Sequence, residues 1–216
     1  MGMITISRKM GSEGNYIGRK AAEKLNMAFA DKAFISKIMR EYGFSEFKEI
    51  YDETPGFWDN FHSSREQTID FLARTEIAIG KADNVVLVGR GGFGLFENFN
   101  DVLNVRAKAP METRVKRQMA EHGISYEEAL KHVEENDKVR KIFIESDFRF
   151  DYQNTNSFDM IINTGIIEPE RAVDYICDVY QSLMKKGRSS TSKNLKDLDV
   201  DPILLKFVKE ELDKIR

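Results

Sequence analysis

The chain has 216 residues, of which 41% are hydrophobic and 32% charged, so it can form one hydrophobic core and is not a disordered or low-complexity protein. Its 33 Lys and Arg and 36 Asp and Glu give a net charge of −3, which argues against a DNA- or RNA-coating protein and against a polybasic membrane protein. The single cysteine excludes an intramolecular disulfide, and no apolar run reaches the ~20 residues of a membrane helix. We expect a cytoplasmic protein that binds neither nucleic acid nor membranes.

Short β-branched runs alternate with longer helical patterns along the chain. Residues 4–7 predict a buried strand, which a glycine-spaced loop connects to a helix with Ile17, Ala21 and Leu25 on one face. Further strands are expected at 85–88, 102–105 and 160–162. Because strands alternate with helices, the pattern indicates an α/β fold with a mostly parallel sheet.

Several helix starts can be read from the sequence. Residues 64–67 and 125–128 both fit capping boxes, and Pro110 and Pro169 suit first-turn positions. The helix after Pro169 has an apolar side, and Cys177 on that side is interpreted as a core residue rather than a reactive thiol.

Residues 34–62 are rich in aromatic side chains and are interpreted as a helical insertion. The aromatic residues are Phe34, Tyr42, Phe44, Phe47, Tyr51, Phe57, Trp58 and Phe61. They form either a small satellite core or a substrate lid that also packs.

The C-terminal part is predicted to be an extension of a main domain that covers residues 1–186. A polar linker at 187–200 precedes a helix with an apolar stripe, which includes Leu204, Val208 and Leu212. Such a stripe needs a partner surface, either on the same domain or on another subunit. A homo-oligomer formed through this helix is therefore one expectation.

The loop at 11–14 has the composition of a phosphate site. In α/β proteins the loop after the first strand presents helix N-terminal amides, and the helix dipole also favours anions there. Gly11, Gly14 and Gly18 follow two basic residues, Arg8 and Lys9, at the end of the strand. The alternative is a plain structural turn with solvated charges.

The other candidate anion-binding residues are arginines. Arg90 follows the most hydrophobic strand and is flanked by glycines, so its planar fork can reach an anion at the carboxyl ends of the strands. Arg114 and Arg117 share one helix face, and Asp137 and Arg140 repeat that spacing on the next helix. Individually such charges are more often surface pairs, but together they would place three guanidiniums near one phosphate chain.

Taken together, these motifs resemble those of the cytidylate-kinase-like family, a branch of the P-loop nucleoside monophosphate kinases. The matching blocks are ITISRKMGSEGNYIGRKAAEKL (4–25), FADK (29–32), VLVGRGG (86–92), VRAKAPMETRVKR (105–117), ENDKVR (135–140) and FDMIINT (158–164). They cover roughly residues 3–185 and leave the C-terminal tail unexplained.

The resemblance implies a five-stranded parallel sheet with helices on both faces, an insertion at about 34–62 that binds the nucleoside monophosphate, and a lid at about 111–150. It implies transfer of the γ-phosphate of ATP, with Mg²⁺, to a CMP-like acceptor. The donor phosphate loop would comprise Gly11, Ser12, Glu13, Gly14 and Asn15. The catalytic lid arginines would be Arg114, Arg117 and Arg140. The residues that bind the acceptor would be Asp31, Lys32, Lys37, Arg90 and Asp137.

Two departures from the family pattern bear on activity. Gly14 stands where a Walker A loop has its lysine, and the apolar Val88 stands where some cytidylate kinases carry an aspartate. Arg8 is our candidate for the missing catalytic cation, although pairing of Arg8 with Glu13 is the alternative, and Lys9 is expected to turn toward solvent. A non-catalytic nucleotide-binding or regulatory protein is the competing hypothesis, and the sequence identifies no metal ligands.

Overall fold

The structure is a computed structural model that describes residues 2–44, 62–188 and 193–216. Its centre is a five-stranded sheet in which all neighbouring strands run parallel, in the order β2-β3-β1-β4-β5. The strands are β1 (Met3–Arg8), β2 (Ala28–Ala30), β3 (Val85–Val88), β4 (Val102–Lys108) and β5 (Met160–Asn163). The resemblance-based prediction of a five-stranded parallel sheet is confirmed, although the residue pattern alone missed β2.

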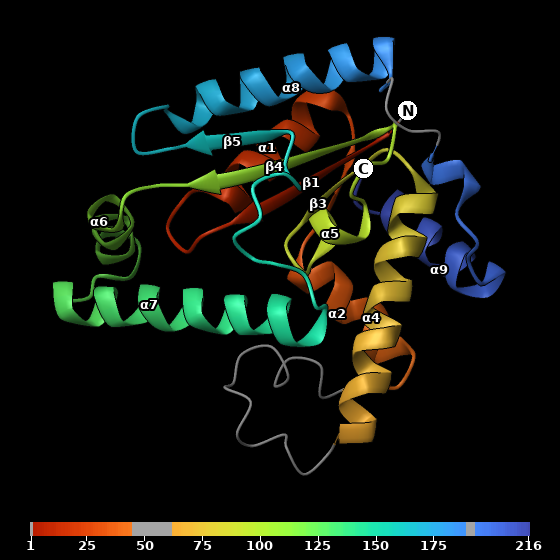
Figure 1. The fold of residues 1–216 in the computed structure, drawn as a ribbon, viewed down its shortest axis with the longest axis horizontal. Helices are drawn as coiled ribbons and strands as arrows, with labels where there is room; N and C mark the ends of the chain where they lie inside the picture. Colours follow the sequence, from red (N-terminus) through yellow and green to blue (C-terminus); the bar gives the residue numbers. More distant parts are fainter. Residues whose placement is uncertain (1, 45–61, 189–192) are drawn as a thin grey trace.

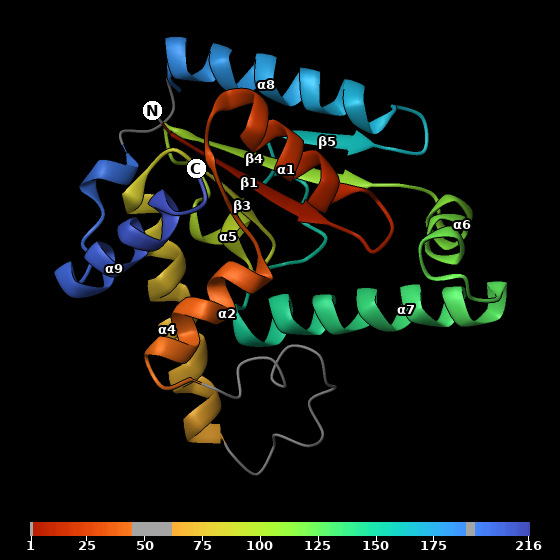
Figure 2. The same ribbon diagram turned by 180° about the vertical axis from the view of Figure 1, so that it is seen from behind.

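Helices cover both faces of the sheet (Figures 1 and 2). Helices α1 (Gly14–Leu25) and α8 (Pro169–Lys186) pack together on one face. The other face carries α4 (His62–Ala82), the short α5 (Gly92–Leu95) and α9 (Pro202–Asp213), with α2 (Lys32–Glu41) beside them. Helices α6 (Met111–His122) and α7 (Tyr126–Ile142) lie at the carboxyl ends of the strands, and a π-helical turn (Phe143–Asp147) follows α7.

The alternation of side chains along the strands divides the interior into two cores. Ile4 and Ile6 of β1 pack with Val86 and Val88 in the core under α1 and α8. Met3 belongs to the other core, together with the apolar faces of α2, α4 and α9. Since both faces of the central strands are buried, those strands read as unbroken apolar runs.

The observed helix starts agree in part with those predicted from the sequence. Ser125 and Glu128 form a complete capping box at α7, as predicted, and Pro169 occupies the first turn of α8. The capping box predicted at Ser64 is wrong, because α4 begins two residues earlier and Ser64 lies inside the helix. Pro110 is the N-cap residue of α6, one position before the first turn.

The described aromatic residues of the predicted insertion join the main core. Phe34 is buried there, Phe44 stacks on Phe71 at 4.7 Å between ring centroids, and Tyr42 contacts both Phe71 and Phe207 of α9. Phe47, Tyr51, Phe57, Trp58 and Phe61 lie outside the described residues, so the choice between satellite core and lid stays open for that segment.

The C-terminal helix packs on its own domain. Leu204, Val208 and Leu212 are buried in the core that α4 and β2 also line, so the partner of the apolar stripe lies within the chain. Buried Glu211 forms ion pairs with Lys37 of α2 and with Lys214. The domain boundary near residue 187 and the oligomeric state stay predictions. Among the helices of the described ranges, none has the length and apolarity needed to cross a bilayer.

The docking of α9 predicts a stability effect. Leu212→Ala should lower the free energy of unfolding by about 2–5 kcal/mol, because it removes a fully buried side chain and leaves a cavity. Ile203→Ala is the matched control, since Ile203 is 74% exposed on the same helix, and its effect should stay within about 0.5 kcal/mol. Urea denaturation measures both. Equal, small effects would show that α9 contributes little to the folded core.

Candidate active site

The loop between β1 and α1 forms an amide-lined cradle. Gly11 and Glu13 both adopt left-handed backbone angles, with φ of 71° and 60°. Helix α1 then begins at Gly14, so the first-turn amides of Gly14, Asn15 and Tyr16 have no acceptor within the helix. These residues line a pocket of about 240 Å³. Amides at a helix N-terminus favour an anion, which agrees with the predicted phosphate loop.

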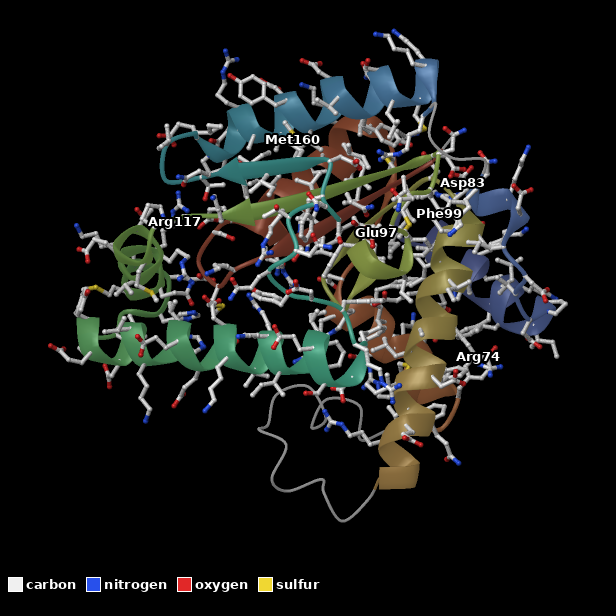
Figure 3. The ribbon with its side chains drawn as sticks, viewed as in Figure 1. Arg74, Asp83, Glu97, Phe99, Arg117 and Met160 are labelled. Carbon is white, nitrogen blue, oxygen red and sulfur yellow. The ribbon has the colours of Figure 1, made fainter. Side chains whose placement is uncertain are left out.

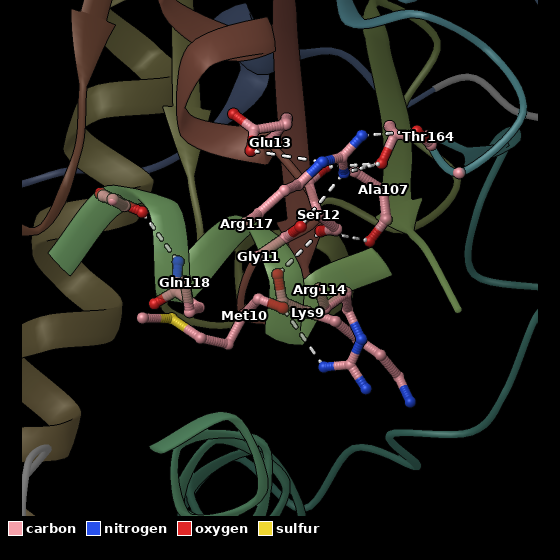
Figure 4. Close-up of polar contacts among 12 residues, drawn as sticks. Lys9, Met10, Gly11, Ser12, Glu13, Ala107, Arg114, Arg117, Gln118 and Thr164 are labelled. Carbon is pink, nitrogen blue, oxygen red and sulfur yellow. Dashed lines mark hydrogen bonds and ion pairs between the residues drawn. The ribbon is translucent and has the colours of Figure 1, made fainter. Parts of the chain in front are cut away.

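Ser12 anchors this loop to the sheet. Its buried hydroxyl lies 2.7 Å from the carbonyl oxygen of Lys9 and 3.1 Å from that of Ala107 in β4 (Figure 4). The hydroxyl of Thr164, just after β5, lies 3.2 Å from the carbonyl oxygen of Ser12. Ser12 therefore supports the loop from below instead of offering its hydroxyl to a ligand.

Arg114 holds the outer side of the loop. It is 3% exposed, and its Nη1 donates to the carbonyl oxygen of Met10 at 3.2 Å and to Asp137 at 2.7 Å. The other oxygen of Asp137 accepts from the amide of Met10 at 3.1 Å. The pair thus satisfies both backbone groups of one loop residue. Arg114 and Asp137, predicted to contact the transferring group and the acceptor, both bind the loop backbone here.

Arg117 makes a second set of loop contacts. It donates to the carbonyl oxygen of Gly11 at 3.1 Å and to that of Thr164 at 2.7 Å, and its Nε lies 3.7 Å from Glu13 (Figure 4). Figure 3 shows Arg117 at the end of the sheet opposite Asp83 and Phe99. Two of the three predicted lid arginines therefore position the loop in this conformation.

Arg8 occupies the space in front of Gly14. A Cβ atom at Gly14 would lie 2.5 Å from the Cβ and 2.8 Å from the Cγ of Arg8, so no side chain fits there while Arg8 keeps its place. The guanidinium continues past the loop: its Nε donates to Asn15 at 3.0 Å, and its Nη1 lies against Gly89, whose φ is 88°. A cation from β1 thus lies beside the loop position that lacks its lysine.

Three guanidiniums converge at the carboxyl ends of β1 and β3. Arg8, Arg90 and Arg140 line one cavity of about 20 Å³, together with Gly89 and Tyr152. Arg140 donates to the carbonyl oxygen of Arg8 at 3.3 Å, while its buried Nε has no hydrogen-bond partner among the described residues. The structure thus brings Arg90 and Arg140 to one cavity, whereas Arg117 does not line it. The cavity has room for about one water molecule, so a phosphate requires the arginine side chains to move.

The remaining predicted acceptor residues lie on α2 or at its N-cap. Asp31 is the N-cap of this helix and accepts from the amides of Ala33 and Phe34. Lys32 is the first residue of the helix. Lys37 forms its ion pair with Glu211 of α9, so its charge is directed toward the C-terminal helix.

Glu76 is a buried carboxylate that the sequence interpretation missed. It is fully buried on α4, and neither carboxylate oxygen has a hydrogen-bond partner in the described structure. Burial raises the pKa of Glu76 well above its ordinary value, and the nearby charge of Arg90 opposes this rise. The only signal in the sequence is an acidic residue on the apolar face that carries Leu72 and Ile79.

The raised pKa of Glu76 predicts a pH-dependent stability. The folded state holds the proton more tightly than the unfolded state, so the stabilisation is complete below the ordinary pKa of 4.5 and is lost as the pH rises through the folded-state pKa. Glu76→Gln should therefore flatten the decline in unfolding free energy above pH 4.5, by up to about 1.4 kcal/mol per pH unit. Urea denaturation at several pH values measures this slope, and Glu134→Gln, at an exposed position, is the control. An unchanged slope in Glu76→Gln would contradict the assignment.

The chain is similar to known proteins over most of its length. The family model described as "Cytidylate kinase-like family" matches residues 3–166. A cytidylate kinase of Ignicoccus hospitalis is 30% identical over 82% of this chain and 97% of its own length. A cytidylate kinase of Methanocaldococcus jannaschii is 27% identical over 85% of this chain and 99% of its own length.

Two solved structures share the fold. An uncharacterized protein from Eubacterium ventriosum has a TM-score of 0.65 at 21% identity, and shikimate kinase from Bacteroides thetaiotaomicron has 0.51 at 17%; each match covers 83% of this chain and 98% of the other. The chain belongs to the cytidylate kinase-like family.

Proposed function

We propose that the protein is a nucleoside monophosphate kinase that transfers the γ-phosphoryl group of ATP to a CMP-like acceptor. Curated relatives matched over nearly their whole length are named cytidylate kinases, which supports a phosphotransferase acting on nucleotides. The amide cradle at 11–16 supports a site for the donor phosphates.

The observation that carries the proposal is the position of Arg8. A phosphate loop without its lysine lacks the charge that normally neutralises the β- and γ-phosphates. Arg8 fills the space that a side chain at Gly14 would need, so the cation comes from the strand side of the loop. Phosphoryl transfer relies on positioning and electrostatic stabilisation, and a guanidinium from another direction can supply the same charge.

In this mechanism each group has a distinct role. The first-turn amides of α1 bind the donor phosphates, and Arg8 stabilises the negative charge on the group in transfer. Arg90 and Arg140 bind the acceptor phosphate from the other side of the cavity. Arg114 and Arg117 act as positioning residues, because they hold the carbonyl oxygens of Met10 and Gly11 away from the anions.

The described residues do not fit a protein-built magnesium cage. They include no group of three acidic, histidine or cysteine side chains that could hold a metal. Asn15 follows the lysine position, and its side-chain oxygen accepts from Arg8, while Val88 is buried and apolar. In kinases Mg²⁺ is held largely by substrate phosphates and water.

One observation favours the competing function of a nucleotide-binding protein without turnover. A kinase is expected to place guanidiniums around the transferred group, yet Arg114 and Arg117 donate to the loop backbone. Those contacts serve binding as well as catalysis. The two functions differ in one measurable property, the release of ADP in the presence of an acceptor.

The central test compares turnover and ATP affinity between the Arg8→Ala variant and the wild-type protein. Turnover should fall by at least ~10²-fold, comparable to the loss of one preorganised charge, while ATP affinity should fall much less because the loop amides remain. A coupled ADP-release assay with the wild-type protein, run across nucleoside monophosphates and small alcohols, first identifies the acceptor.

The control for charge removal is Lys20→Ala, an exposed cation on α1 paired with Glu23. It should leave turnover unchanged. Wild-type turnover in Arg8→Ala would remove Arg8 from the mechanism. Absence of ADP release from the wild-type protein with every acceptor would favour the binding protein.

Arg90→Ala should weaken acceptor binding roughly tenfold to hundredfold, because it removes a charge-assisted contact worth about 1.5–3 kcal/mol. The measurement is the acceptor KM together with direct binding by calorimetry. Since Arg90 also faces buried Glu76, the double variant Arg90→Ala with Glu76→Gln separates lost binding from lost stability. Unchanged acceptor affinity in both variants would exclude Arg90 from the acceptor site.

A further inference from the structure

A cationic pocket lies apart from the phosphate loop and the arginine cavity. It has a volume of about 440 Å³, and its cations are Lys9, Arg106, Lys108, Lys138 and Lys141. It shares only Lys9 with the loop pocket and only Tyr152 with the arginine cavity. Its lining residues come from the carboxyl half of β4, the edge strand β5, α7 and the segment that precedes β5, elements that Figure 1 labels. This volume is typical of small-molecule sites.

The fold itself brings these charges together. Arg106 and Lys108 are two residues apart on β4, so their side chains point to the same face of the sheet. Lys138 and Lys141 are three residues apart on α7, so they share one face of that helix. The amide of Lys9 bonds to the carbonyl oxygen of Ala107, next to Lys108. Regular backbone geometry therefore concentrates positive charge in a protein whose net charge is −3.

Arg106 is the most informative of these residues. It is only 8% exposed, and its guanidinium donates to the carbonyl oxygen of Tyr152 at 2.7 Å and lies 4.5 Å from the centroid of the Tyr152 ring. Within the described ranges no carboxylate forms an ion pair with it. Buried charges in proteins are usually paired, because an uncompensated charge away from water is costly.

The acidic groups near the pocket leave most of the charge uncompensated. Asp137 is engaged by Arg114 and by the amide of Met10, and Glu145 lies 3.9 Å from Lys141. Lys9, Lys108 and Lys138 have no ion-pair partner among residues that the structure describes. A polyvalent anion would neutralise several of these cations at once.

We propose that this cationic pocket is a second anion site, for a polyvalent phosphate that is either inorganic or carried on a small organic molecule. The lysine ammonium groups each supply three donors, and the Arg106 guanidinium supplies a buried positive charge at the wall. Ile161, 38% exposed at the pocket, and the ring of Tyr152 give an organic moiety apolar surface to contact. The site is independent of the proposed kinase activity.

The test is isothermal titration calorimetry of the full chain with inorganic pyrophosphate, and with fructose 1,6-bisphosphate as an organic probe. The wild-type protein should show a site that Lys108→Ala with Lys138→Ala weakens at least about tenfold. Arg8→Ala should leave that site intact, because Arg8 lies in the loop pocket and the arginine cavity. Tighter binding of the bisphosphate would identify an organic ligand, and binding of pyrophosphate alone an inorganic one.

The matched control is Lys116→Ala with Lys131→Ala, which removes two exposed cations from α6 and α7 that pair with Glu112 and Glu135. Equal weakening in this control would overturn the proposal, because it would reflect overall charge. Binding unchanged in the Lys108/Lys138 variant would also overturn it. Failure of the kinase proposal gives a different result, namely no ADP release while the lysine-dependent site persists.

Discussion

The contact between the two helices α6 and α7 and the backbone of the loop between β1 and α1 is the constraint on which the candidate site depends. Arg114 and Asp137 together satisfy the carbonyl and the amide of Met10, and Arg117 binds the carbonyl of Gly11. A loop with left-handed residues is costly to keep in one conformation unless its surroundings fix it. These contacts orient the loop carbonyls outward, toward the arginines, and leave the first-turn amides of α1 to line the pocket.

This arrangement changes how the lid is understood. A lid that delivers arginines to a transferring group must move relative to the loop that binds the donor phosphates, yet two of the predicted lid arginines, Arg114 and Arg117, donate to the backbone of the loop between β1 and α1. Helices α6 and α7 and residues 9–13 therefore form one connected unit in this conformation. Arg140 differs from the other two, because its side chain lines the cavity with Arg90 and donates to the carbonyl oxygen of Arg8 at the end of β1.

The sequence predicts the framework well, because the framework follows from periodic patterns. The strands at 4–7, 85–88, 102–105 and 160–162 all exist. The apolar runs of the central strands reflect burial on both faces, whereas Ile161 of the edge strand β5 is 38% exposed. Strand β2 was not predicted from the pattern because three residues, two of them alanines, carry little strand signal. The partners of arginines are harder to predict, since a guanidinium is equally suited to a phosphate and to a backbone carbonyl. Glu76 and Arg106 escaped detection because only the tertiary structure buries them.

Arg90 shows a consequence of this architecture for the energetics of the chain. Its φ of 61° lies in the left-handed region, which glycine occupies freely and which costs other residues about 1 kcal/mol. The two residues that flank it, Gly89 and Gly91, also have positive φ. A glycine at position 90 would relax the turn, so the backbone here favours the absence of a side chain. The turn after β3 is thus a place where the protein forgoes folding free energy in order to keep a positive charge at the ends of its central strands.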